Sequence, residues 1–274
     1  MRNVFLTGAS AGIGRAIAEL LAENGYRTWG TSRNISRLPT LRNFSPIELD
    51  LNRPESILNG VNRALEESHG FDILINNGGS GVFGPLVLTD DDILREQFQT
   101  LVFGPMEIVR LLLPGIRERG RGPIINVTSL AARFPIPYMG IYSAAKAALG
   151  SLSWSLEMEL IEQGIRVVEL QPGDIGSDFH RAMKRHPALE QADSNDDMSR
   201  AFRAYSRRME RAPPPAQVAR SVLAIIERDA PPPSRVVVGS AFQSRIAPFL
   251  AKISPLPWTR FVLRRYYGLK SRRS

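Results

Sequence analysis

A tyrosine, a lysine and a serine are the side chains of this sequence whose types and positions best suit catalysis. Tyr142 and Lys146 are four residues apart at the start of a strongly helical segment, so both project from one helix face, one turn apart. Ser129 lies just after the end of the predicted strand 123–127, at the carboxyl edge where open α/β sheets bind ligands. Phenol, ammonium and hydroxyl groups can all donate hydrogen bonds to an oxygen. Taken singly, such a pair is common on helix surfaces and such a serine is often a cap.

A glycine-rich turn follows the first predicted strand, residues 4–6, and leads into a helix at about residues 13–23. The turn reads Thr7-Gly8-Ala9-Ser10-Ala11-Gly12-Ile13-Gly14. In such a turn one glycine permits the sharp reversal, a second lets the backbone approach a pyrophosphate, and a third lets helix and strand pack closely. The phosphates then lie at the helix N-terminus, where free N–H groups favour an anion. A tight connection without a ligand is the alternative, but the position after the first strand favours dinucleotide binding.

The end of the second predicted strand, residues 26–31, indicates which dinucleotide binds. An acidic residue about 20 positions after the glycines would bind the ribose 2′-hydroxyl of NAD. Here the sequence is Trp29-Gly30-Thr31-Ser32-Arg33-Asn34, with no acidic residue. The guanidinium of Arg33 can pair with a 2′-phosphate through two parallel hydrogen bonds. An exposed loop arginine is the alternative, but the missing acid favours NADP(H) over NAD.

The elements that must position these residues alternate between strand and helix. Short apolar strands are predicted at residues 4–6, 26–31, 44–49, 71–76, 123–127, 165–170 and 235–238. Helices are predicted at residues 13–23, 54–68, 91–116 and 140–163, with a bend at Pro105. This alternation predicts an α/β fold: a single Rossmann-like, doubly wound parallel sheet of about seven strands with helices on both faces.

Composition limits the kind of protein and the kind of site. The 274 residues include no Cys and three scattered His, so disulfides, thiolate chemistry and a metal site are not expected. The pattern runs without a linker through residues 1–240, which predicts one domain. Residues 241–274 form a basic, aromatic extension with eight Lys or Arg and no acidic residue, so residues 1–240 are formally neutral. With no signal segment and no apolar run of about 20 residues, a cytoplasmic protein is expected.

Several ordered motifs together resemble the short-chain dehydrogenase/reductase family over residues 1 to about 240. They are Thr7-Gly8-x-x-x-Gly12-Ile13-Gly14, Asp50 after the third strand, Asn76-Asn77-Gly78-Gly79, Ser129, Tyr142-x-x-x-Lys146, and Pro172-Gly173 after the sixth strand. Because the order and spacing match, the set is far more specific than any one motif. The resemblance implies hydride transfer between a nicotinamide cofactor and a small-molecule ketone, aldehyde or alcohol.

The resemblance also implies a role for each matching residue. Tyr142 exchanges a proton with the substrate oxygen, assisted by the Lys146 ammonium and the nicotinamide charge, which favour the phenolate. Lys146 also holds the nicotinamide ribose, and Ser129 orients the substrate oxygen. The implied cofactor-binding residues are Gly8, Ser10, Gly12, Ile13, Gly14, Arg33, Asp50, Leu51, Asn76, Gly78, Tyr142, Lys146, Pro172, Gly173, Ile175 and Ser177. A homodimer or homotetramer is the usual assembly in the family.

Two segments depart from the alternating pattern. Residues 178–215 are polar and charged, and the resemblance implies a lid over the substrate. Its larger apolar residues face either an apolar substrate or the inside of a surface helix; they are Met183, Leu189, Met198, Phe202, Tyr205 and Met209. For the aromatic and basic segment 257–267 three roles are open. Docking on the protein itself or on a second subunit ranks first, binding to an anionic membrane second, and binding to nucleic acid third. A membrane-bound enzyme would act on lipid-like, steroid or retinoid carbonyls.

One position differs from the family pattern. In the long helix the family usually has Asn three residues before Gly104, where it holds a water that links the lysine to bulk solvent; here Leu101 occupies that place. Leu has no hydrogen-bonding group. Either Gln99, Thr100 or another group completes the proton relay, or turnover is slow, or catalysis has been lost. A catalytically weak NADP(H)-binding regulator or scaffold is therefore an alternative function.

If Leu101 limits the proton supply to Lys146, the substitution Leu101→Asn should raise kcat, because an amide can hold the missing water. Steady-state kinetics with NADPH and a carbonyl substrate, together with a thermal unfolding curve, measures this effect. An unchanged or lower kcat in a folded variant would count against the hypothesis.

Overall fold

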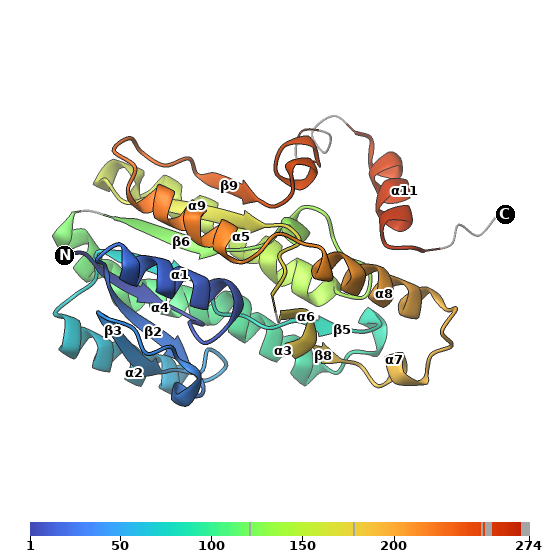
Figure 1. Cartoon of the computed structure of the whole chain (residues 1–274), viewed down its shortest axis with the longest axis horizontal. Helices are drawn as coiled ribbons and strands as arrows, with labels where there is room; N and C mark the ends of the chain where they lie inside the picture. Colours follow the sequence, from blue (N-terminus) through green and yellow to red (C-terminus); the bar gives the residue numbers. More distant parts are fainter. Residues whose placement is uncertain (121, 178, 248, 250–253, 270–274) are drawn as a thin grey trace.

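Seven parallel strands form one sheet in the computed structural model, which describes residues 1–120, 122–177, 179–247, 249 and 254–269. In spatial order they are β3 (Phe44–Glu48), β2 (Arg27–Ser32), β1 (Asn3–Leu6), β4 (Ile73–Asn76), β6 (Pro123–Val127), β7 (Arg166–Pro172) and β9 (Arg235–Val238). From β1 the chain moves first to one edge of the sheet and then, from β4 onward, to the other (Figure 1). The predicted doubly wound sheet of seven strands is confirmed.

Helices cover both faces of the sheet, as predicted. On one face α1 (Gly12–Glu23) packs beside α9 (Ala216–Ile226), and their apolar side chains share a buried cluster with the central strands. The other face carries α2 (Pro54–Ser68), α4 (Gly104–Arg119) and α5 (Gly140–Leu160). Because β1, β4 and β6 lie between these layers, their residues are buried throughout. This burial explains why their sequences are mostly apolar without alternation.

The segment predicted as one helix at residues 91–116 is divided in two. After α3 (Asp91–Phe98) comes a π-helical turn at Gln99–Phe103, and α4 begins at Gly104. The backbone stays right-handed helical at both ends of the π turn, which lies just before Pro105, whose missing N–H and ring disturb the preceding turn. Short 3-10 turns occur at Ile35–Arg37, Leu86–Leu88, Leu130–Ala132 and Ile161–Gln163.

The segment 178–215 folds mostly into short helices; its first residue, Asp178, lies outside the described residues. The elements are α6 (Phe179–Ala182), β8 (Lys184–Arg185), α7 (Ala188–Gln191) and α8 (Asp197–Glu210), and β8 pairs in parallel with β5 (Val82–Phe83). Its apolar residues join a third buried cluster: Met183, Met198, Tyr205 and Met209 are buried there, and Leu189 and Phe202 pack against them. Most of these apolar residues therefore hold segment 178–215 against the rest of the protein.

The extension at residues 241–274 folds back toward the body. It contains a π turn at Phe242–Ile246 and α11 (Leu256–Tyr266), while Lys252, Lys270, Arg272 and Arg273 lie outside the described residues. The carboxyl end of α11 docks near α8. Tyr267, which follows the helix, is buried, and the Gly268 carbonyl accepts a hydrogen bond from Arg200 of α8. The structure thus shows docking on the protein's own surface, at the end of the molecule that carries α8 (Figure 1). Among the described helices, none has the length and apolar character to cross a membrane.

Candidate active site

A chain of buried polar contacts fixes α5, the helix that carries two of the predicted catalytic residues, on the sheet. Asn76 on β4 and Asn126 on β6 are paired in register, and the Asn76 amide donates to Asn126 Oδ1 at 2.9 Å. Asn126 Nδ2 donates to Ser153 Oγ on α5 at 2.8 Å, and that hydroxyl donates to the Leu149 carbonyl. Since unpaired buried polar groups are costly, these bonds hold the helix in one register against the strands.

Asn76 therefore has a different position from the one expected of an adenosine-binding residue. Its side chain is buried between the strands, with the Pro105 carbonyl and Asn126 as its partners, and it does not line the cavity described below. Its neighbour Asn77 turns to the glycine loop instead, donating to the Thr7 carbonyl at 3.0 Å.

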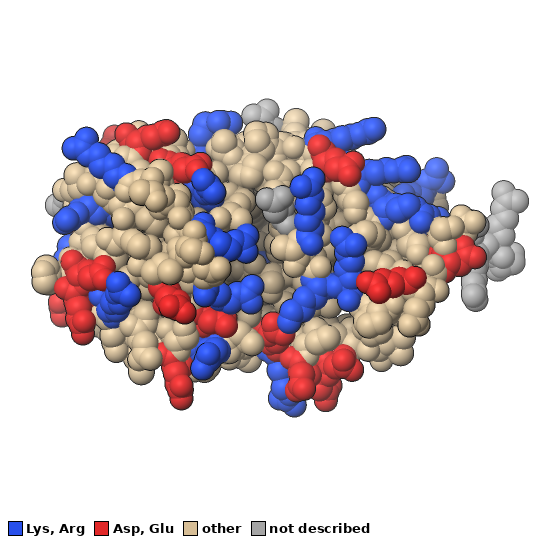
Figure 2. All heavy atoms as spheres, turned by 60° about the horizontal axis from the view of Figure 1, so that its bottom comes forward, with Lys and Arg blue, Asp and Glu red and all other residues tan. Residues whose placement is uncertain are grey.

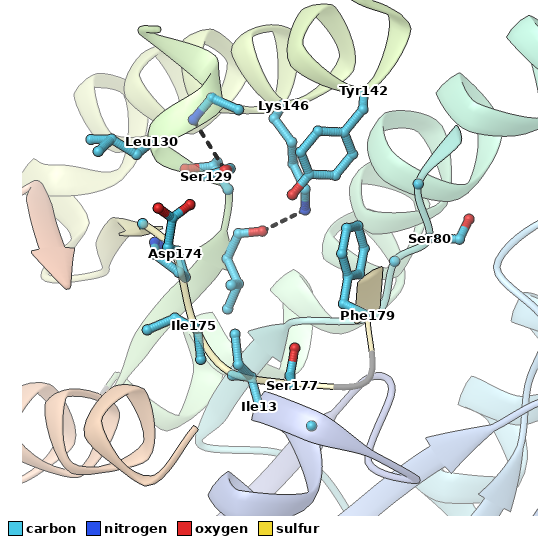
Figure 3. A pocket seen from close by; sticks show the side chains of 18 of the residues that line it. Ile13, Ser80, Ser129, Leu130, Tyr142, Lys146, Asp174, Ile175, Ser177 and Phe179 are labelled. Atoms are coloured by element: carbon cyan, nitrogen blue, oxygen red, sulfur yellow. Dashed lines mark hydrogen bonds between the residues drawn. The ribbon is translucent and has the colours of Figure 1, made fainter. Parts of the chain in front are cut away.

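Ser129 is held by the short turn that follows β6. It caps the 3-10 turn Leu130–Ala132, and its Oγ accepts a hydrogen bond from the Ala131 N–H at 3.1 Å. Because this bond uses an acceptor lone pair, the hydroxyl proton stays available to donate. Figure 3 shows the Ser129 side chain on the same wall of the cavity as Tyr142 and Lys146.

Tyr142 and Lys146 project together from the first turns of α5 (Figure 3). The Lys146 Nζ lies 6.0 Å from the centroid of the Tyr142 ring and donates a hydrogen bond to the Val127 carbonyl at 2.7 Å. Phe179 from α6 packs on the other side, with its ring centroid 5.5 Å from that of Tyr142. The segment predicted to be a lid thus touches the tyrosine directly.

Burial changes the acidity of both groups. It raises the pKa of Tyr142 to about 12, and the hydrogen bond with Ser129 opposes this effect only in part. Burial also lowers the pKa of Lys146 to about 8. The loss of hydration therefore dominates the pKa of both side chains. At neutral pH the phenol keeps its proton, which is the form that can protonate a carbonyl oxygen.

The glycine turn has no space for side chains at its closest approaches. Gly8 has φ +71°, and a Cβ there would lie 2.6 Å from Gly78 Cα; a Cβ on Gly14 would lie 2.0 Å from the Gly8 carbonyl oxygen. The hydroxyl of Thr7 accepts from the N–H groups of Asn77 and Gly78 at 2.9 and 2.8 Å. The ends of β1 and β4 are thereby tied together beneath the turn.

Two arginines lie where β2 ends. Arg33 and Arg37 both line the cavity and are exposed, and the Asn34 side chain caps the turn between them by accepting from the Ser36 N–H. Arg37 was not identified from the sequence. Figure 2 shows Lys and Arg side chains around the hollow in the middle of the molecule, while Asp and Glu gather along the lower border and also appear near the top of that view. The two guanidinium groups after β2 suit an anionic ligand.

One cavity of about 490 Å³ connects the glycine turn with the three predicted catalytic side chains. The predicted site residues that line it are Ser129, Tyr142, Lys146, Gly8, Ser10, Gly12, Ile13, Gly14, Arg33, Asp50, Leu51, Gly78, Pro172, Gly173, Ile175 and Ser177. Lining residues that sequence reasoning missed include Arg37 and, from α11 and the residue after it, Trp258, Val262, Leu263, Tyr266 and Tyr267. The aromatic pattern of segment 257–267 was the one signal for the α11 residues, and it does not specify where the helix docks.

Leu101 is completely buried in the π turn and lies close to Lys146. A Cβ on Gly79 would lie 2.8 Å from Leu101 Cδ2 and 3.8 Å from Lys146 Nζ. Of the two neighbours named as substitutes for the proton relay, Gln99 donates its amide to the Leu51 carbonyl, whereas Thr100 lines the cavity. Of these two side chains, Thr100 is therefore the better placed to take part in a proton relay.

This chain is similar to short-chain dehydrogenases in sequence and in structure. The sequence profile of the short chain dehydrogenase family matches residues 2–188. A 3-ketodihydrosphingosine reductase of Bacteroides thetaiotaomicron is 29% identical, over 97% of this chain and 98% of the relative. A short-chain dehydrogenase from Streptomyces avermitilis has a TM-score of 0.76 at 28% identity and covers 98% of both chains. L-Sorbose reductase from Gluconobacter frateurii, complexed with NADPH and L-sorbose, has a TM-score of 0.72 at 26% identity over 86% of this chain and 94% of that one.

The lowered pKa of Lys146 predicts how stability depends on pH. Between about pH 8 and 10.5 the unfolded chain binds a proton at Lys146 that the folded chain has released, so stability should rise with pH. The free energy of unfolding of the wild type, minus that of Lys146→Met, should increase over this range by up to about 1.4 kcal/mol per pH unit. Urea unfolding without cofactor at pH 7, 8, 9 and 10 measures it; a constant difference would contradict the burial effect.

Proposed function

Since this chain belongs to the short-chain dehydrogenase family, we propose that it is an NADP(H)-dependent oxidoreductase that interconverts a ketone or aldehyde and the corresponding alcohol. The observation that carries this proposal is the meeting of Ser129, Tyr142 and Lys146 on one cavity that extends to the glycine turn. A binding protein without turnover has no need of a buried tyrosine next to a buried lysine. We therefore prefer an enzyme to a regulator or scaffold as the function of this protein. We also expect a cytoplasmic enzyme that forms a homodimer or homotetramer.

The residues present suit a phosphorylated dinucleotide. The N-cap of α1 is Ala11, which makes no side-chain cap, and the first turn holds no acidic residue, so the N–H groups there are available to a pyrophosphate. Gly14 lets the start of α1 pack against the glycine turn, because a Cβ there would clash with the Gly8 carbonyl. Arg33 and Arg37 line the cavity just after β2, so their guanidinium groups could pair with a 2′-phosphate. The sorbose reductase relative, whose structure holds NADPH, supports the same preference.

The side chains of this protein would bind the substrate and move its proton. In reduction, the Ser129 hydroxyl donates a hydrogen bond to the carbonyl oxygen, and Tyr142 Oη gives that oxygen its proton. In oxidation the same oxygen of Tyr142 accepts the proton. Lys146 Nζ would hold the nicotinamide ribose of a bound cofactor and would return a proton to the tyrosine. A bound NADP(H) supplies or accepts the hydride. The 3-ketodihydrosphingosine reductase relative, named for reducing a ketone, supports the reaction class.

Replacing Tyr142 by Phe should lower kcat by about 10²- to 10⁴-fold, because the proton donor is lost while the ring remains. The Kd for NADPH, measured by fluorescence titration, should stay nearly unchanged. Tyr138→Phe is the matched control, since Tyr138 is close in sequence but does not line the cavity, and it should keep wild-type turnover. Equal turnover in Tyr142→Phe and wild type on a panel of carbonyls would rule out the proposed mechanism and favour a binding protein.

Replacing Arg33 by Ala should weaken NADPH binding by about tenfold to a hundredfold, because a charged hydrogen-bonding pair is lost. NADH has no 2′-phosphate, so its Kd should stay the same. Arg42→Ala serves as the control, since Arg42 is exposed just before β3 and lies outside the cavity. Equal weakening of NADPH and NADH binding would show that Arg33 does not select the cofactor.

A further inference from the structure

Helix α11 forms one wall of the cavity, although it lies well beyond the residues that match the family profile. The α11 residues in the lining, with the residue that follows the helix, are Trp258, Thr259, Val262, Leu263, Tyr266 and Tyr267. Their spacing of one and three positions places them on a single face of the helix. Tyr205 and Met209 of α8 also line the cavity. The extension thus contributes to the substrate side of the site, away from the glycine turn.

Arg208 of α8 holds this wall in place. Its guanidinium lies 4.2 Å and 4.4 Å from the ring centroids of Tyr266 and Tyr267, and its Nη1 donates to the Tyr266 carbonyl at 3.0 Å. The Tyr266 hydroxyl donates to Asp174 Oδ2 at 3.0 Å, directly after Gly173. Cation–π contacts and charged hydrogen bonds in a partly buried place are worth more than exposed ones. The carboxyl end of α11 is therefore fixed to both α8 and the loop after β7.

Among the residues that the structure describes, each charged group in the walls on this side already has a partner within the protein. Away from the glycine turn and the ends of β2 and β3, these charged lining residues are Glu96, Lys146 and Asp174. Glu96 is paired with Lys184 at 2.5 Å and Asp174 with Arg208 at 3.3 Å, while Lys146 donates to a backbone carbonyl. An ionised group on the substrate would be desolvated here without a partner, which is costly. The lining instead favours uncharged, apolar material.

The amino end of α11 leaves the cavity open. Trp258 is 65% exposed and Val262 47% exposed, although both line the cavity. Apolar surface that lines a cavity and is still open to water gains free energy when an apolar ligand covers it. A chain longer than the cavity can therefore continue along the α11 face toward solvent.

We propose that the α11 face is the binding site for a long, uncharged alkyl chain attached to the reacting carbon, so that the substrate class is a long-chain aliphatic ketone or its alcohol. This inference rests on the proposed oxidoreductase function. The carbonyl oxygen lies at Ser129 and Tyr142, and the alkyl chain runs between α8 and α11. Val262 and Leu263 then set the preference for chain length.

The test is a series of 2-alkanones from four to twelve carbons, reduced with NADPH below their solubility limits. For the wild type, kcat/KM should rise about two- to fourfold for each added methylene until the α11 face is covered, because each buried methylene contributes a transfer free energy. Val262→Ser and Leu263→Ser should flatten this rise, because the polar side chains remove the apolar surface that each added methylene would cover. Leu256→Ser is the matched control: Leu256 is 80% exposed on the same helix, outside the lining, so the rise should persist.

The outcomes separate this inference from the function on which it rests. Reduction of every ketone with a kcat/KM independent of chain length overturns the alkyl-chain site and keeps the oxidoreductase. A rise with chain length that survives in both serine variants overturns the assignment to α11. Bound NADPH with no reduction of any ketone overturns the oxidoreductase and the substrate class together. Circular dichroism and thermal unfolding of each variant verify that the fold is retained.

Discussion

The site depends on one geometric constraint, that all seven strands of the sheet point the same way. Their carboxyl ends therefore meet at a single edge, and so do the turns that follow β1, β2, β4, β6 and β7. Residues far apart in the chain, such as Gly8, Ser129 and Gly173, thereby line one cavity. Buried bonds then fix the details: the Asn76–Asn126–Ser153 contacts set the register of α5 on the sheet.

Sequence patterns predicted the sheet and most of the cavity because the signals are local. A buried parallel strand shows as an apolar run, and a turn that excludes side chains shows as glycine, as at Gly8 and Gly14. Asn76 was placed differently, since its neighbour across the sheet, Asn126, is 50 residues away and no local pattern pairs them. The wall formed by α11 could not be predicted from local patterns either, because it depends on a contact between Arg208 and Tyr266, which are 58 residues apart.

Burial has two effects in this molecule. The apolar packing that stabilises α5 on the sheet also removes water from Tyr142 and Lys146, which raises the pKa of the phenol and lowers that of the ammonium. The folding core and the proton chemistry are thus two results of the same packing. A leucine at position 101, completely buried beside Lys146, makes this surrounding still drier than a polar side chain would.

The attachment of α11 near Asp174 bears on the order in which the protein is made. A ribosome completes the glycine turn, the tyrosine and the lysine long before residues 256–267, and the wall that meets α8 is added last. The glycine turn can therefore be made well before the wall at α8 exists. Changes in residues 256–267 would therefore alter the wall of the cavity near α8 and Asp174, at a distance in sequence from the glycine turn.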